Sequence, residues 1–191
     1  MQMTKITTSS GLNIFIRPDT PDEYEDVNEL VLKAFTNSYD NDTAAEILGH
    51  LIEARGRDTF VSELSLVALL ENGKMVGQIT LFETDIITDT GKITQLVLSQ
   101  SAVLPDYRNN GIMREMITFA LSKAKEMGYA AVFLGGPTNL YKKFGFVPSY
   151  KYNIHHEKSG EVEGYEEGYM VHVLIEGAFD GITGTTSYFG G

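Results

Sequence analysis

The residues best suited to chemistry form a short turn, Arg108 to Met113, between an apolar run and an amphipathic segment. Apolar residues recur at three- and four-residue steps from Ile112 to Met127, which predicts a helix that starts at this turn. The first N–H groups of a helix have no partner within it, and the helix dipole places partial positive charge there. Gly111 lets another group approach the backbone, and Arg108 adds a full charge. The turn is therefore predicted to bind an anion such as a pyrophosphate.

Two motifs, in this order, resemble those of the GNAT superfamily of N-acetyltransferases. The family's Arg/Gln-x-x-Gly-x-Gly/Ala segment is similar to Arg108-Asn109-Asn110-Gly111-Ile112-Met113, and its usual entry is similar to Ala102-Val103-Leu104-Pro105. Its Tyr-x-x-x-Gly-Phe signature is similar to Tyr141-Lys142-Lys143-Phe144-Gly145-Phe146. Met113 departs from the pattern, because Gly or Ala usually stands there, and a bulkier side chain could narrow the pyrophosphate site. The ending, residues 177–191, resembles one bacterial subgroup described mostly as predicted acetyltransferases.

This resemblance implies an acetyl-CoA-dependent N-acetyltransferase that moves an acetyl group to a primary amine by direct attack in a ternary complex. Acetyl-CoA would be a cosubstrate, and no metal is implied. The pyrophosphate would bind backbone N–H groups of Arg108, Asn109, Asn110, Gly111, Ile112 and Met113. In the family the central strand splays from its parallel neighbour before this turn, and pantetheine pairs with the exposed backbone. In this chain that position corresponds to Ala102 and Val103.

The resemblance implies Tyr141 as the general acid, and it carries over no general base, for which Glu83 is one candidate. A phenol with a normal pKa of about 10 keeps its proton at pH 7, so Tyr141 can donate it to the leaving thiolate. The alternative is a tyrosine that only fills the gap between helix and sheet. Glu83 is expected at the end of a strand facing the central one. A water held by Gln95 or Ser99 is the other candidate base, and Glu83 is then a plain surface carboxylate.

A rival function is a non-catalytic module that binds or senses acyl-CoA, favoured by Met113 and by the absence of an obvious base. A third is a nucleotide-phosphate binder unrelated to CoA. The acceptor is expected to be a small-molecule or peptide amine, and a homodimer through a sheet edge near the C-terminus is left open.

Charge and composition narrow these choices. The net charge of −11 argues against nucleic-acid binding. The stretch from Arg108 to Lys151 nevertheless holds seven basic residues against two acidic ones, a net +5, so the rest of the chain carries −16. A basic patch suits a polyphosphate, and an acidic remainder suits a cationic amine. Without cysteine, a long apolar run or an apolar start after Met1, the chain is expected to be cytoplasmic, without signal peptide or membrane span.

The pair His155-His156 beside Glu157 raises the question of a metal site. Adjacent residues of a strand point to opposite faces, so these two imidazoles are not expected to share one ion. No metal site is predicted.

The elements that must position these residues are predicted as a single α/β (α+β) domain over residues 1–191, with a mixed, mostly antiparallel central sheet flanked by helices. Residues 1–12 are expected to be a loose lead-in, and residues 177–191 a Gly-rich C-terminal extension packed by Phe179, Tyr188 and Phe189. Capping boxes at Thr20/Glu23 and Thr43/Glu46 predict two helix starts. Asn72-Gly73 predicts a type I′ hairpin turn. Strands are predicted at residues 14–17, 64–70, 75–83, 93–103, 130–134, 150–155 and 169–175, and further helices at 112–127 and 137–144.

Overall fold

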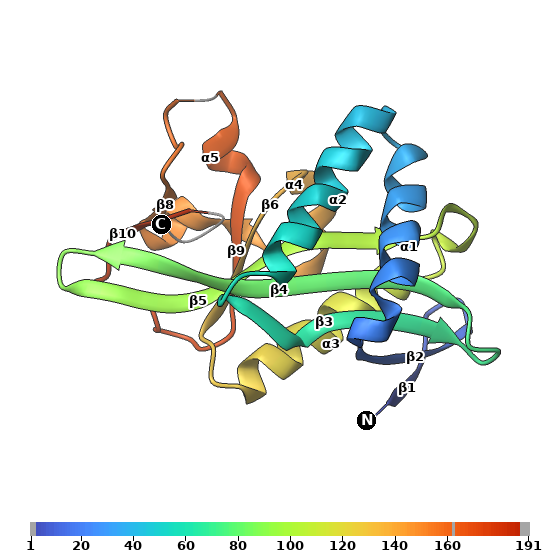
Figure 1. Cartoon of the computed structure of the whole chain (residues 1–191). Helices are drawn as coiled ribbons and strands as arrows, with labels where there is room; N and C mark the ends of the chain where they lie inside the picture. Colours follow the sequence, from blue (N-terminus) through green and yellow to red (C-terminus); the bar gives the residue numbers. More distant parts are fainter. Residues whose placement is uncertain (1–2, 162, 188–191) are drawn as a thin grey trace. The chain divides into compact units, whose positions relative to one another are not determined.

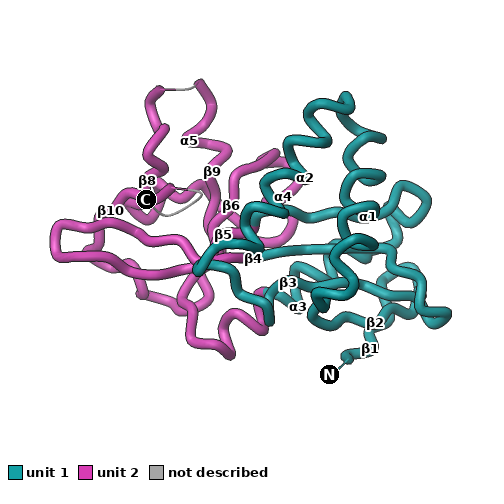
Figure 2. The backbone as a smooth tube through the Cα atoms, viewed as in Figure 1, with its two compact units in different colours: residues 1–81, 99–120 teal, residues 82–98, 121–191 magenta. Residues whose placement is uncertain are grey.

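The computed structural model describes residues 3–161 and 163–187. The chain divides into two compact units, residues 1–81 with 99–120 (unit 1) and residues 82–98 with 121–191 (unit 2) (Figure 2). Two long strands run through both units, since β4 (Met75–Thr88) and β5 (Gly91–Val103) each cross the division. The single domain over 1–191 stays a prediction.

The other elements are shown in Figure 1. The remaining strands are β1 (Thr4–Thr7), β2 (Asn13–Pro18), β3 (Phe60–Leu70), β6 (Ala131–Gly135), β7 (Val147–Pro148), β8 (Ile154–His156), β9 (Tyr169–Val173) and β10 (Gly184–Thr186). The α-helices are α1 (Tyr24–Thr36), α2 (Asn41–Arg55), α3 (Ile112–Glu126), α4 (Thr138–Tyr141) and α5 (Tyr165–Gly168). Short 3₁₀ turns lie at Pro21–Glu23, Pro105–Tyr107, Lys142–Phe144 and Ser149–Tyr152.

Unit 1 is a sheet in the order β1-β2-β3-β4-β5 with helices on both faces (Figure 1). Helices α1 and α2 bury an apolar stripe against one face, in a cluster that includes Val27, Val31 and Leu51 of the helices with Val67 and Ala102 of the sheet. The first turns of α3 pack closely on β4 at Gly77. A Cβ on this glycine would lie 2.8 Å from Met116 Sδ and 3.2 Å from Ile112 Cγ2, so only glycine lets α3 come this near.

Unit 2 continues the strand order as β4-β5-β6-β9-β7. The β5–β6 pair is parallel, with Leu96 opposite Val132, whereas β6–β9 and β7–β9 are antiparallel. Strand β10 pairs antiparallel with β4 and parallel with β8. The predicted mixed, mostly antiparallel sheet flanked by helices is confirmed.

The first predicted helix start is confirmed and the second is corrected. The Glu23 carboxylate accepts from the Thr20 N–H at 3.1 Å, and the 3₁₀ turn there leads directly into α1. Helix α2, in contrast, begins at Asn41, because the Asp40 carboxylate accepts the Thr43 N–H at 2.8 Å and so takes the capping position. Thr43 therefore lies inside the helix.

Three further predictions were wrong in detail. Asn72 has no positive φ, whereas Gly73 has φ 83°, and Gly73 donates to the Leu70 carbonyl, so this hairpin is a three-residue loop that ends in a left-handed glycine. Residues 4–7 are not a loose lead-in, because they form β1 on β2. The strand predicted from 150 begins only at Ile154, after a 3₁₀ turn that ends at left-handed Asn153.

The C-terminal segment is part of unit 2 as far as the structure describes it. Phe179 is 4% exposed and its ring lies 6.2 Å from that of Phe133 and 6.4 Å from that of Tyr152. Gly184 permits the β10–β4 pairing, because a Cβ there would lie 2.5 Å from Ile86 Cγ2. Tyr188 and Phe189, predicted to pack this segment, lie outside the described residues.

Candidate functional site

The predicted anion site is the connection from β5 to α3, and it lies wholly in unit 1. After the 3₁₀ turn, Asn109 (φ 63°) and Gly111 (φ 81°) both adopt left-handed backbone conformations. The helical hydrogen bonds of α3 begin with the Glu115 N–H, which donates to the Gly111 carbonyl at 3.2 Å. The amides of Ile112 and Met113 therefore come before the first helical bond, as an anion site at a helix start requires. The Ile112 side chain is buried and that of Met113 is half-buried.

The Arg108 guanidinium has a structural position that the sequence did not predict. Its Nη2 donates to the Ala34 carbonyl at 2.7 Å, its Nη1 to Ser38 Oγ at 3.2 Å, and its Nε to the Val103 carbonyl at 3.2 Å. Its backbone N–H donates to the Pro105 carbonyl at 3.2 Å. Arg108 thus joins the turn to the C-terminal end of α1, so within this turn the later amides are the better candidates for anion contacts.

The Asn110 side chain holds the turn in shape. Its Nδ2 donates to the Tyr107 and Arg108 carbonyls at 3.2 and 3.1 Å. One side-chain amide thus donates to two main-chain carbonyls of the turn. These hydrogen bonds hold the turn in one conformation and do not depend on a ligand.

The predicted pantetheine contacts, Ala102 and Val103, are the last two residues of β5. The Ala102 side chain is 2% exposed and belongs to the apolar cluster under α1 and α2. The Val103 carbonyl accepts from Arg108 Nε, and the next residue, Leu104, donates its N–H to the Val76 carbonyl at 3.0 Å. Because the side chains of both residues are buried, a ligand could pair only with their backbone. Backbone pairing is the role that the resemblance implies.

Tyr141 lies in unit 2 at the end of α4 and is 8% exposed. Its ring meets those of Phe144 and Phe146 edge-on, at 6.4 and 6.0 Å. Gly136 makes room for it, because a Cβ there would lie 2.6 Å from Tyr141 Cε2. Gly145 of the same motif has φ 85°, and a Cβ would lie 3.1 Å from the His172 ring. Phe144 and Phe146 of the motif, together with Gly136 before it, thus surround the Tyr141 ring.

The candidate bases have other partners, Glu83 and Gln95 within unit 2 and Ser99 within unit 1. Tyr129, which follows α3, donates its hydroxyl to Glu83 Oε1 at 2.6 Å. Gln95 Oε1 accepts the N–H groups of Ala130 and Ala131, both at 2.9 Å, and so contacts the chain where β6 begins. The Ser99 hydroxyl donates to Gln100 Oε1.

The two adjacent histidines have separate environments in unit 2, as strand alternation predicted. His155 Nδ1 lies 3.1 Å from Glu166 Oε1, whereas His156 is 3% exposed and its ring packs 4.7 Å from those of Tyr165 and Tyr169. Burial lowers the pKa of His156. Within residues 3–161 and 163–187, no group of three or more His, Cys, Asp or Glu is arranged to hold a metal ion.

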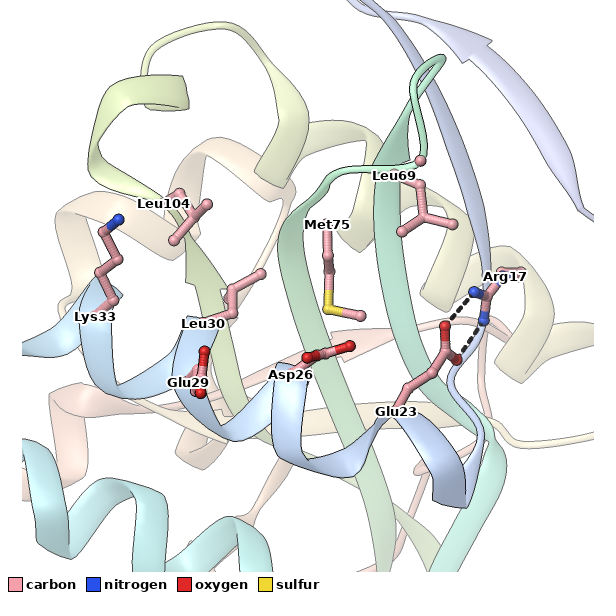
Figure 3. A pocket seen from close by; sticks show the side chains of 10 residues that line it. Arg17, Glu23, Asp26, Glu29, Leu30, Lys33, Leu69, Met75 and Leu104 are labelled. Atoms are coloured by element: carbon pink, nitrogen blue, oxygen red, sulfur yellow. Dashed lines mark hydrogen bonds and ion pairs between the residues drawn. The ribbon is translucent and has the colours of Figure 1, made fainter.

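Unit 1 also contains an open groove of about 340 Å³ along α1 (Figure 3). Leu30, Leu69, Met75 and Leu104 supply apolar surface, and Asp26, Glu29 and Lys33 lie along its α1 side. Glu23, at one end, is bound by Arg17 (Figure 3). Apolar surface beside carboxylates can accommodate an organic cation.

Sequence reasoning missed a buried polar network between α2 and the sheet of unit 1. Arg55 Nη2 lies 3.2 Å from Asp19 Oδ2, and the same oxygen accepts the Ser65 hydroxyl at 2.9 Å. Because the Ser65 proton goes to Asp19, the Thr80 hydroxyl is the donor to Ser65 Oγ at 3.2 Å, and Thr80 Oγ1 accepts from Gln78 Nε2. Burial raises the pKa of Asp19 and lowers that of Arg55. These residues are too far apart in the chain for any local pattern to pair them.

Comparisons with known proteins agree with this geometry. Residues 15–149 match the acetyltransferase (GNAT) domain family. The chain is 30% identical over 176 residues to the uncharacterized N-acetyltransferase YhbS of Escherichia coli K12, covering 92% of this chain and 96% of that protein. The crystal structure of YhbS from E. coli in complex with CoA is similar at a TM-score of 0.75 and 27% identity, covering 93% of this chain and 90% of that one. A GNAT acetyltransferase from Brucella melitensis in complex with acetyl-CoA is similar over 70% of this chain, at 25% identity and a TM-score of 0.57.

Proposed function

Because this chain belongs to the GNAT family of acetyltransferases, we propose that it transfers an acetyl group from acetyl-CoA to a primary amine by direct attack in a ternary complex. The observation that carries the proposal is the turn before α3, where left-handed Gly111 precedes amides that come before the first helical hydrogen bond. The similar E. coli structure is a CoA complex, which supports a coenzyme as the anion bound there.

In the proposed reaction the amine nitrogen attacks the thioester carbon, a C–N bond forms and the C–S bond breaks. The amine gives up a proton and the CoA thiolate receives one. We propose Tyr141 as the proton donor to sulfur and Glu83 as the acceptor of the amine proton. The amides of residues 109–113 would hold the diphosphate, and the backbone of Ala102 and Val103 would pair with pantetheine.

The rival function is an acyl-CoA-binding module without catalysis. Half-buried Met113, at a position where the family has Gly or Ala, and the Tyr129 hydroxyl bound to Glu83 are the observations that favour it. Both functions require the same coenzyme contact, so coenzyme binding alone does not separate them.

The test is calorimetric titration with acetyl-CoA, followed by measurement of free thiol release with a panel of aliphatic, aromatic and peptide amines. Transfer to any amine, with the acetylated product seen by mass spectrometry, supports the proposal. Binding without transfer to any member of the panel favours the sensor. ATP binding in place of CoA would indicate a nucleotide binder and overturn both.

A further inference from the structure

The hairpin turn between β1 and β2, residues Thr8 to Gly11, contacts the turn before α3 within unit 1. Ser10 Oγ donates to the Asn110 carbonyl at 3.0 Å, across 100 residues of sequence. On the same side, a Cβ on Gly111 would lie 2.9 Å from Ser9 Oγ and 3.4 Å from Thr8 Cβ. The N-terminal hairpin thus packs against Gly111, which directly precedes α3 in the candidate coenzyme site.

The hydroxyl groups of this hairpin turn form a directed chain of hydrogen bonds. The Leu12 N–H donates to Thr8 Oγ1 at 3.2 Å, and Thr8 Oγ1 is 3.0 Å from Ser10 Oγ. Because the Ser10 proton is given to Asn110, the Thr8 hydroxyl must be the donor to Ser10. Thr8 is 4% exposed, so the chain starts from a fixed, buried residue. Hydrogen bonds in such a series strengthen one another.

The contact has a consequence for the Gly111 amide. In a trans peptide unit the carbonyl oxygen and the following N–H point in opposite directions. No cis peptide bond is present among the described residues, so the Asn110 carbonyl and the Gly111 N–H share one such plane. By holding the Asn110 carbonyl toward the hairpin, Ser10 directs the Gly111 N–H to the opposite side, away from the hairpin.

We propose that Ser10 is a positioning residue for coenzyme binding, which orients the Asn110–Gly111 peptide so that the Gly111 N–H faces the diphosphate of acetyl-CoA. This inference rests on the proposed function, because it assigns the diphosphate to the α3 turn. The N-terminal hairpin then belongs to the coenzyme site through its contact with the Asn110 carbonyl. The benefit is preorganisation, since the amide need not reorient when the diphosphate arrives.

The experiment measures the Kd of CoA by calorimetry for the full chain and three variants. Ser10→Ala removes the donor and should raise Kd about three- to tenfold, the effect of one lost hydrogen bond. Ser10→Thr keeps the hydroxyl and should restore the wild-type value. Thr7→Ala is the matched control, because Thr7 Oγ1 donates to Asn13 Oδ1 at 2.8 Å on the same hairpin without contact to Asn110.

The outcomes separate the two proposals. Wild-type protein that does not bind CoA overturns the proposed function and this inference with it. Wild-type binding with an unchanged Kd for Ser10→Ala overturns the inference alone. An equal loss in Thr7→Ala would also overturn it, because hairpin stability rather than the Ser10 contact would then control affinity.

Discussion

The Arg108 guanidinium donates to the Ala34 carbonyl at 2.7 Å and so joins the turn before α3 to the end of α1. The last carbonyls of a helix lack partners within it, and a positive charge is favourable there. This residue, expected from sequence to attract an anion directly, therefore acts within unit 1 as a bridge between two elements.

Replacing Arg108 with lysine should destabilise the protein although the charge is kept. One ammonium group cannot reach Ala34, Ser38 and the Val103 carbonyl together, so at least one part-buried carbonyl loses its charged donor at a cost of about 1–3 kcal/mol. Thermal and urea unfolding measure the effect, with Lys33→Arg, an exposed residue on α1, as control. If Arg108→Lys were as stable as wild type, the positive charge alone would account for the stabilisation, and the three hydrogen bonds of the guanidinium would not be needed.

Tyr141→Phe should lower the rate of acetyl transfer by about 10² or more, because a general acid contributes on this scale. The ring contacts with Phe144 and Phe146 remain, so the Kd of acetyl-CoA should change little. The control is Tyr150→Phe, which removes a hydroxyl that donates to Glu167 Oε1 at 2.8 Å on an exposed surface. Equal rates for Tyr141→Phe and wild type would exclude Tyr141 as the acid.

Lowering the pH should reduce the stability of unit 1, because the Arg17–Glu23 ion pair is lost when Glu23 is protonated. The Arg17 guanidinium, with help from Thr20, lowers the pKa of Glu23 to about 2. A carboxylate with a lowered pKa stabilises the fold above its unfolded pKa of about 4.3, and the contribution is lost as pH falls from there toward 2. Glu23→Gln should therefore be less stable than wild type at pH 6, and this difference should shrink below pH 4.

Chemical unfolding across this pH range measures the difference. Glu25→Gln removes an exposed carboxylate from the first turn of α1, two residues further along the chain, and serves as control. A wild-type advantage that stayed constant down to pH 2 would contradict the role of the pair.

Two glycine-to-alanine changes in unit 1 should have opposite effects on the free energy of unfolding. Gly77→Ala places a methyl group 2.8 Å from Met116 Sδ and should cost about 1–3 kcal/mol by overpacking under α3. Gly49→Ala, inside α2, meets nothing within 4 Å and should stabilise the helix by about 0.5–1 kcal/mol. Urea unfolding of both variants tests this, and a Gly77→Ala protein as stable as wild type would show that the α3–β4 contact can relax.

The C-terminal segment should be required for the stability of unit 2. Phe179→Ala removes a ring that is 4% exposed and in contact with Phe133, at a cost of about 3–5 kcal/mol. Ile175→Ala, at 44% exposure, should stay within about 0.5 kcal/mol of wild type. Similar small losses for both variants would mean that the segment is only peripheral.

The sequence by itself determined the elements whose signals are local. The apolar period of α3 and the apolar runs of β3, β4 and β5 depend on near neighbours in the chain, so they could be predicted. Tertiary structure decided the elements and contacts whose partners are distant. Strands β1 and β10 have too few residues for a periodic signal and exist because β2, β4 and β8 pair with them.

The direction of side chains at the candidate site was likewise decided by the fold. Arg108 finds its acceptor 74 residues away and Ser10 finds Asn110 across 100 residues, separations at which no spacing rule operates. A motif predicts which backbone can bind an anion, because backbone geometry follows from local residue types. Which neighbouring side chains hold that backbone depends on how the rest of the chain packs around it.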